Sequence, residues 1–275
     1  MNNLNFRLRI HVFFVLIITI CIFIAGIVWL QSKQQHYQHM SGSKLTTTLT
    51  TNEEIQTVTS ILSEENLKKL IRDSQPKVVT IEVMKEDGLY FGSGFLYNGE
   101  GDIVTNAHVV EGATEITIKL ADETEYSGIL IGVGKGIDIA VIRVPELIGQ
   151  EPLKISRRYV GEIGNHVVAL GSPLGLENTV TLGIISGLDR SFTLQEYEYV
   201  DTYQISAPIS PGSSGGPLLD RATGEVIGIN SAKVNSETIG FSIPIVTVLP
   251  ILENWSKHPY GIINNSPEED PPSYD

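Results

Sequence analysis

The feature that most constrains the fold is a series of short segments in which apolar and polar residues alternate. The alternation is clearest in EITIKL (115–120), and it is typical of a strand with one buried face. Because no helical pattern separates these segments, we predict an all-β fold with two antiparallel barrels, or else a large sandwich. The predicted strands form two sets, at 78–83, 91–97, 102–110, 115–120, 126–133 and 138–144, and then at 166–172, 178–187, 198–206, 225–232 and 240–245.

The remaining segments differ from the strands in composition. SEENLKKLIRDSQ (63–75) has apolar residues at helical spacing, acids in its first turn and bases later, which predicts a short amphipathic helix ending before Pro76. Residues 31–62 are polar and predict a linker, and residues 258–275 predict a solvated acidic tail. The predicted folded domain covers 63–257, with barrels at about 76–150 and about 160–255.

The overall composition restricts the classes of function. The chain has 275 residues, of which 41% are hydrophobic, enough for a sizeable buried core. A net charge of −13 argues against nucleic-acid binding, which needs clustered Lys and Arg. Cys21 is the single cysteine, so an intrachain disulfide is impossible and packing must hold the fold.

An uncharged apolar run begins at Val12 and ends at Leu30. As a helix it would extend about 28 Å, close to the hydrocarbon thickness of a bilayer. A cleaved signal peptide has a shorter apolar region that ends in small residues, whereas this run ends with Val28, Trp29 and Leu30. We therefore predict an uncleaved transmembrane anchor, with residues 1–11 in the cytoplasm and the folded domain outside.

The run SAPISPGSSGGPLLD (206–220) concentrates Ser, Gly and Pro directly before an apolar segment. Such a run can be only a turn. In the alternative interpretation Ser214 is a nucleophile, and Gly212 lets backbone N–H groups point to one place. The same letters fit the G-x-S-x-G elbow of α/β-hydrolases, but that motif requires a helix after the serine. Since Pro217 and a strand-like segment follow, we discard the elbow.

A serine nucleophile needs a general base, and the base needs a carboxylate that orients it. His108 lies at the end of a predicted strand in the first half, and Asp138 begins the apolar segment DIAVIRV. Each could instead be satisfied locally, the histidine in the core and the aspartate by its own turn. Taken together, His108, Asp138 and Ser214 would place the base and its orienter on one barrel and the nucleophile on the other.

Five motifs carry a resemblance to a known family: TNAHVV, DIAVIRV, GSPLGLENTVTLGIISGL, APISPGSSGGPL and GFSIPI. In this order and spacing, the chain resembles the protease domain of the HtrA/Deg family of trypsin-like serine endopeptidases. The resemblance implies a chymotrypsin/trypsin-like double β-barrel with His108 as general base, Asp138 as orienter and Ser214 as nucleophile. It implies an oxyanion hole built from backbone N–H groups of Gly212, Ser213 and Ser214, and no metal or organic cofactor.

The same resemblance implies a serine endopeptidase that acts on unfolded or damaged extracytoplasmic proteins through an acyl-enzyme. With the predicted anchor, this would be a single-pass protein of a bacterial-type cell membrane. The family often forms trimers, so a homotrimer is a further expectation. The alternative is a catalytically silent protease fold that acts as a peptide-binding or chaperone module.

The sequence departs from the family pattern in three places. Ser213 stands where the family usually has Asn, the KEDGLY loop is short, and the chain ends soon after the last predicted strand, so we expect no PDZ domain. Ser213 also carries no charge. Digestive relatives pair an Asp at this position with a freed N-terminus, so the oxyanion loop of this chain must be ordered in another way.

The predicted substrate pocket is apolar. The segments 207–211, 229–232 and 240–243 contain neither Asp nor Glu, so a substrate Lys or Arg would lose its hydration without a partner. Lys233 is close in sequence, and the alternative is that its cation reaches the pocket. The residues predicted to line the pocket are Ile209, Ile229, Asn230, Ser231 and Phe241, which favours cleavage after small or medium apolar residues.

Overall fold

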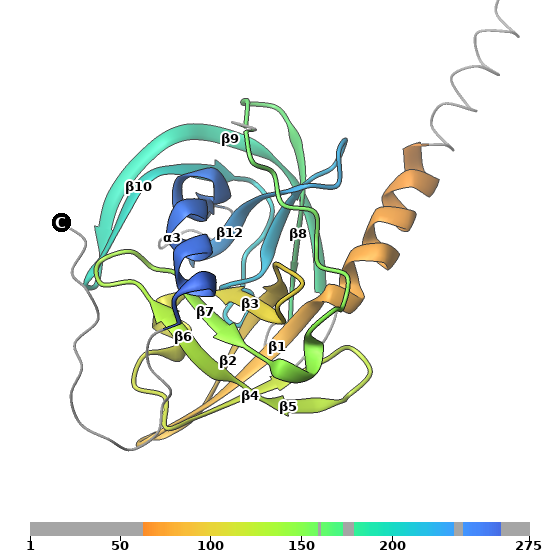
Figure 1. Cartoon of the computed structure of the whole chain (residues 1–275). Helices are drawn as coiled ribbons and strands as arrows, with labels where there is room; N and C mark the ends of the chain where they lie inside the picture. Colours follow the sequence, from red (N-terminus) through yellow and green to blue (C-terminus); the bar gives the residue numbers. More distant parts are fainter. Residues whose placement is uncertain (1–62, 159–160, 173–178, 234–238, 260–275) are drawn as a thin grey trace, which may run out of the picture. The chain divides into compact units, whose positions relative to one another are not determined.

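The computed structural model describes residues 63–158, 161–172, 179–233 and 239–259 (Figure 1). Residues 63–74 are helical, and the short 3-10 helix η1 (Gln75–Lys77) follows. Leu67, Leu70 and Ile71 pack against the core. The amphipathic helix predicted from the apolar spacing is therefore confirmed over these residues.

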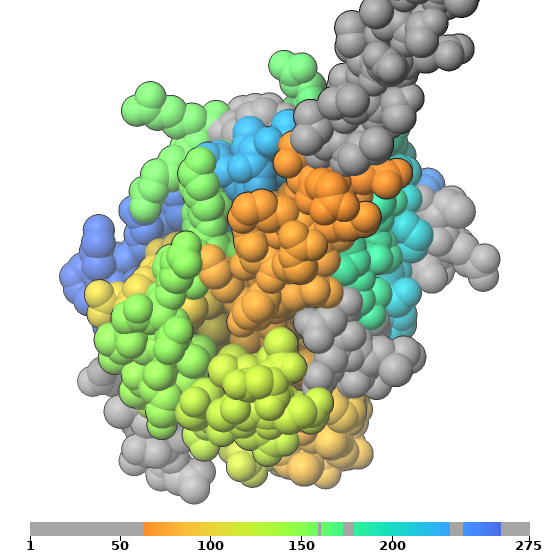
Figure 2. Space-filling model, turned by 90° about the vertical axis from the view of Figure 1, so that its right-hand side faces the viewer, coloured from red at the N-terminus to blue at the C-terminus, as the bar shows by residue number. Residues whose placement is uncertain are grey.

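The first half is an antiparallel seven-stranded sheet in the order β5-β4-β1-β2-β3-β7-β6. Figure 2 shows one side of this half, where β1, in orange, lies beside β4, in yellow-green, and β4 pairs in turn with β5. The strands are β1 (Val78–Lys85), β2 (Gly88–Leu96), β3 (Asp102–Thr105), β4 (Glu115–Lys119), β5 (Glu125–Ser127), β6 (Ile129–Val133) and β7 (Ala140–Arg143).

A bend at Gly128 brings the two edges of this sheet together. Gly128 alone separates β5, which pairs with β4, from β6, which pairs with β7. A Cβ atom at Gly128 would lie 2.7 Å from the Ile142 side chain and 3.0 Å from that of Ile116. The predicted single strand at 126–133 is therefore two strands, because the chain must turn sharply inside the curled sheet.

The second half is a closed barrel in the order β10-β13-β12-β11-β8-β9. The 3-10 helix η2 (Pro145–Leu147) lies in the connection between the halves. Strand β9 continues to Leu194, well past the predicted end at 187, and pairs with β10 up to the hairpin turn. The strands are β8 (His166–Gly171), β9 (Thr179–Leu194), β10 (Tyr197–Ile205), β11 (Pro217–Asp220), β12 (Val226–Lys233) and β13 (Gly240–Pro244).

The structure contains two helices, α2 and α3, where the periodicity of the sequence did not predict a helix. The predicted strand 102–110 ends at Thr105, and α2 (Ala107–Val110) follows as a short helix that carries His108. Helix α3 (Ile245–Lys257) was not predicted, because its β-branched start and Pro250 are unusual in helices. Its buried residues are Ile245, Val248, Leu249, Leu252 and Trp255.

One hydrophobic cluster joins the two halves. It contains Ile139 and Val141 from the first half together with Val168 and Ile229 from the second, all fully buried. Helix α3 packs against β6, β7 and β12, as Figure 1 also shows. Because the halves share this core, residues contributed by different halves can hold a fixed geometry.

A buried ion pair fixes the end of α3. The guanidinium of Arg143 donates to both carboxylate oxygens of Asp102, at 2.7 and 3.0 Å, and to the Ser256 carbonyl at 2.9 Å. Asp102 is fully buried, and Asn98 also donates to it. The hydrogen bond to the Asp102 side chain raises the pKa of Arg143, so the guanidinium stays charged.

Replacing Arg143 with methionine should lower the free energy of unfolding by about 3 kcal/mol, because it leaves Asp102 charged, buried and without its cation. Arg157→Met is the matched control. Arg157 also binds a residue of α3, Glu253, but its side chain is 68% exposed, so its loss should cost less than about 1 kcal/mol. Urea unfolding of the full chain, followed by tryptophan fluorescence, measures both values. Equal losses in the two variants would contradict the assigned role of Arg143.

The predicted anchor at 12–30 lies outside the described residues, as do the linker and the tail from residue 260. Among the residues that the structure does describe, no helix is long and apolar enough to cross a membrane.

Candidate active site

The three residues predicted to act together come from three connections between strands. His108 is on α2, directly after β3, and Asp138 lies just before β7. Strands β3 and β7 pair along their length, so their ends bring these two residues together. The Asn106 side chain donates to the Asp138 carbonyl at 2.7 Å and fixes this junction. Ser214 lies in the loop between β10 and β11 of the second half.

His108 and Asp138 form a close pair. The Nδ1 atom of His108 lies 2.9 Å from both carboxylate oxygens of Asp138, and the His108 backbone N–H donates to Oδ1 at 3.0 Å. A carboxylate accepts only, so Nδ1 carries a proton, and in the neutral imidazole Nε2 then has the lone pair. The Asp138 side chain is fully buried, whereas that of His108 is 33% exposed. The imidazole is therefore accessible to a substrate, while the buried Asp138 carboxylate fixes its orientation.

Two hydroxyl groups of the second half also bind Asp138. Ser231 donates to its Oδ2 atom at 2.6 Å and Tyr199 at 2.7 Å, and the two hydroxyls lie 3.0 Å apart. Burial raises the pKa of Asp138, but the hydrogen bonds from His108, Ser231 and Tyr199 outweigh it, so the pKa lies below its usual value. Asp138 therefore stays ionised, as a partner of an imidazolium must be.

The role of Tyr199 could not be found from sequence. Its ring is 3% exposed and stacks on Phe192, with centroids 4.8 Å apart, and Phe192 meets Phe241 edge to face at 4.7 Å. A buried tyrosine hydroxyl needs a partner, but the strand pattern of β10 does not say which one. Burial, followed by the charge of Asp138, raises the pKa of Tyr199, so its hydroxyl remains a donor.

Tyr199→Phe should lower kcat/KM about tenfold, because it removes one of the donors to a buried carboxylate and keeps the ring. Tyr197→Phe is the matched control. Tyr197 is equally buried, but its hydroxyl donates to Glu111 at 2.9 Å, and we expect activity close to that of the unmodified chain. Steady-state hydrolysis of a peptide substrate measures the effect. A similar loss in both variants would show that general packing is responsible.

The Ser214 hydroxyl is held away from the base in this state. It donates to the Ser231 carbonyl at 2.9 Å, and within the described residues it forms no hydrogen bond with His108. Such contacts often tighten only when substrate binds.

The loop around Ser214 contains two glycines with positive φ. Gly212 and Gly215 have φ angles of +93° and +87°, which favour glycine. A Cβ atom at Gly215 would lie 2.2 Å from the Ser93 carbonyl, so this position also needs glycine for space. The Ser213 N–H donates within the loop, to Ser210. The N–H groups of Gly212 and Ser214 donate to no described protein acceptor, which leaves both for a substrate oxygen.

The residues predicted to line the pocket are all buried: Ile209, Ile229, Asn230, Ser231 and Phe241. Their side chains have different surroundings. Ser231 points to Asp138, and the Asn230 amide donates to the Pro217 carbonyl at 3.0 Å. Ile209 packs against Gly240, where a Cβ atom would lie 2.6 Å from its Cγ1 atom.

Comparisons with known proteins agree with this arrangement. Residues 92–229, half of the chain, match the family model for the trypsin-like peptidase domain. The chain is 41% identical over 177 residues to the putative serine protease HhoB of Synechocystis sp., covering 62% of this chain and 42% of that protein. It is 34% identical over 247 residues to the serine protease Do-like HtrB of Bacillus subtilis, covering 79% of this chain and 54% of that protein.

Two solved structures are similar in fold. The HtrA-type protease AlgW with tripeptide superposes with a TM-score of 0.64 and 33% identity, over 70% of this chain and 64% of that one. The serine endoprotease from Yersinia pestis superposes with a TM-score of 0.61 and 29% identity, over 70% of this chain and 66% of that one. This chain spans about half the length of the curated relatives it matches. With the family model, the shared fold and these relatives in agreement, the chain belongs to the trypsin-like peptidases and is a homologue of the HtrA/DegP serine proteases.

Proposed function

We propose that this protein is a serine endopeptidase. The observation that carries the proposal is the His108–Asp138 pair, in which a buried carboxylate holds Nδ1 and leaves Nε2 without a hydrogen-bond partner among the described residues. That is the arrangement of a base with its orienter. The names of the relatives, which are serine proteases and endoproteases, support the same reaction class.

The mechanism follows from these groups. The Ser214 hydroxyl leaves the Ser231 carbonyl and turns to Nε2 of His108, which removes its proton as the oxygen attacks the scissile carbonyl. The N–H groups of Gly212 and Ser214 receive the oxyanion. His108 then gives the proton to the leaving amine, which leaves an acyl group on Ser214. Water, activated by the same imidazole, releases the acyl group and restores the serine.

Hydrolysis of unfolded casein by the full chain in detergent tests the proposal, with Ser214→Ala beside it. Loss of cleavage in the variant, with casein binding retained, is the expected result. If the unmodified chain binds unfolded casein but does not cleave it, the alternative holds, and the protein is a peptide-binding or chaperone module.

We propose that the substrates are unfolded proteins outside the cytoplasm and that residues 12–30 anchor the protease to the membrane. The support is the uncharged run in the sequence and the quality-control function that the HtrA/Deg resemblance implies. The anchored protein should stay with membranes in alkaline carbonate. A soluble chain that begins after Leu30 would show a cleaved signal instead. We also propose that the protein forms a homotrimer, as the HtrA/Deg resemblance implies, and the molecular mass of the detergent-solubilised protein tests this.

We predict that cleavage follows Val, Ala, Ile or other small to medium apolar residues. The wall segments carry no acid, and Ile209 lies against Gly240, so a charged substrate side chain would find no partner among them. Discrimination among apolar residues should be weak, because one methylene changes the transition-state energy by only about 1 to 3 kcal/mol. Mass spectrometry of casein digests measures the preference. Predominant cleavage after Lys or Arg would contradict the pocket and leave the catalytic assignments intact.

A further inference from the structure

The loop that carries Ser214 lacks the charged pair that orders it in digestive relatives, since Ser213 is uncharged. In its place the structure shows Ser93, on β2 of the first half. The Ser93 backbone N–H donates to the Ser214 carbonyl at 2.8 Å, and its hydroxyl donates to the Gly212 carbonyl at 2.5 Å. Ser93 therefore holds the loop on both sides of Ser213.

Ser93 is itself fixed by two further hydrogen bonds. Its carbonyl accepts from the Thr105 hydroxyl at 2.7 Å, and its own hydroxyl oxygen accepts from the Ser172 backbone N–H at 2.8 Å. Ser93 is fully buried, so these bonds are shielded from competing water. Its backbone and side-chain hydrogen-bonding groups are all engaged, and the residue has little freedom to turn away from the loop.

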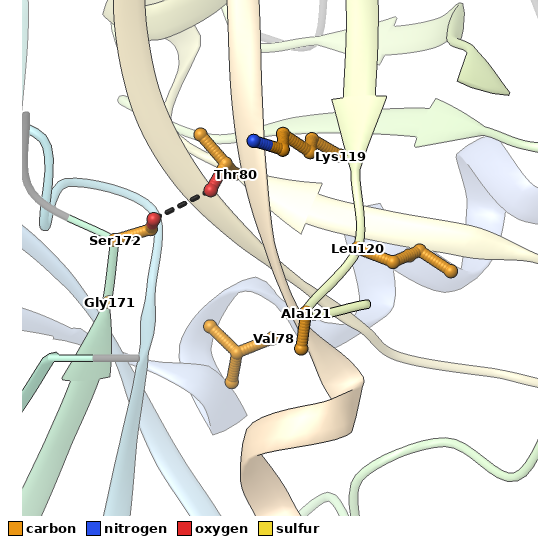
Figure 3. Close-up of a pocket in the computed structure, with 7 residues that line it drawn as sticks. All are labelled: Val78, Thr80, Lys119, Leu120, Ala121, Gly171 and Ser172. Atoms are coloured by element: carbon orange, nitrogen blue, oxygen red, sulfur yellow. Dashed lines mark hydrogen bonds between the residues drawn. The ribbon is translucent and has the colours of Figure 1, made fainter. Parts of the chain in front are cut away.

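The direction of the Ser93 hydroxyl is determined by its partners. The Ser172 N–H can only donate and the Gly212 carbonyl can only accept, so the Ser93 proton must point to Gly212. The Ser172 hydroxyl is bonded in turn to that of Thr80 on β1, at 2.6 Å (Figure 3). Both residues line a narrow crevice between the halves, with Val78, Lys119, Leu120, Ala121 and Gly171. A series of hydrogen bonds thus connects Thr80 and Ser172, at the interface of the halves, through Ser93 to Gly212 in the loop.

We infer that Ser93 is the positioning residue that keeps the oxyanion loop in its working form. The peptide between Gly212 and Ser213 is held at both ends, its carbonyl by Ser93 and its N–H by the Ser210 carbonyl. The N–H groups of Gly212 and Ser214 lie on either side of this peptide, so its orientation sets theirs. Neutral hydrogen bonds from the first half thereby replace an ion pair. This inference rests on the proposed endopeptidase function.

Ser93→Ala should lower kcat about 10- to 100-fold with little change in KM, because misplaced donors weaken only the transition state. Inhibitors separate this effect from a loss of packing. Affinity for a peptidyl boronate, which forms a tetrahedral adduct with the serine, should fall in parallel with kcat/KM. Affinity for the corresponding product peptide, which needs no oxyanion hole, should be unchanged.

Two matched variants test whether the loop contact itself matters. Ser172→Ala keeps the backbone N–H that binds Ser93, and Thr80→Val keeps the shape of Thr80, so each should stay within about threefold of the unmodified chain. Ser93→Cys keeps a side chain of similar size with a weak donor, and should lie between Ser93→Ala and the unmodified chain. Ser93→Cys also replaces Ser93→Ala as the test variant if Ser93→Ala does not fold.

Equal kcat for Ser93→Ala, Ser93→Cys and the unmodified chain would overturn the inference, as would equal losses of boronate and product affinity. In either case cleavage that still depends on Ser214 leaves the proposed function standing. An unmodified chain without any hydrolysis would instead overturn the proposed function, and the inference with it.

Discussion

Ser214→Ala and His108→Ala should each lower turnover by about 10⁴-fold or more, because nucleophile and base act as one unit and neither works without the other. Ser214 lies in the loop in which Gly212 and Gly215 have positive φ, and His108 is the proposed base, whose Nδ1 lies 2.9 Å from Asp138. Single-turnover and steady-state hydrolysis of a fluorogenic peptide measure the loss. Both variants should melt near the temperature of the unmodified chain.

His166→Ala is the control for the histidine. His166 is exposed at the start of β8 and should be dispensable for turnover. If either Ser214→Ala or His108→Ala kept near-normal proteolysis, with the protein preparation free of other proteases, the assignment of that residue would be wrong.

Asp138→Asn should lower kcat by a similar factor of about 10⁴, for a different reason. An amide group can turn its NH₂ toward Nδ1 of His108, which would move the proton to Nε2 and remove the lone pair that the reaction uses. The substitution also removes the charge that stabilises the imidazolium. Ser231 and Tyr199 would lose their ionised acceptor at the same time.

Kinetics of Asp138→Asn beside Asp122→Asn measure this effect. Asp122 lies in an exposed turn, where it accepts from the backbone N–H of Thr124, and its substitution should leave kcat unchanged. Among the described residues, Asp138 is the single carboxylate in contact with His108. Retention of most activity in Asp138→Asn would therefore mean that the imidazole needs no orienting charge.

Much of the fold could be predicted from the sequence, because alternation with a period of two reports directly which face of a strand is buried. The strands at 115–119 and 166–171 agree with the prediction to within a residue or two. The errors lie where local preference conflicts with packing. Helix α3 has a β-branched start and an internal proline, yet it is helical because its apolar face covers the core shared by the two halves.

The sequence by itself determined the identity of His108, Asp138 and Ser214 as candidates, since each stands in a motif with a recognisable local form. It also indicated that an uncharged Ser213 could not order the loop as an aspartate does. These are statements about residue types and short-range patterns. Residue types and short-range patterns can be read from the sequence without knowledge of the fold.

The tertiary structure alone decided which groups support those three residues. Tyr199 and Ser231 are separated from Asp138 by 61 and 93 positions, and Ser93 is 119 positions from Gly212. A hydrogen bond depends on distance and direction between atoms, and no period or spacing in the sequence specifies these across two halves of a fold. The present orientation of the Ser214 hydroxyl, toward Ser231 and away from His108, is a consequence of the same long-range packing.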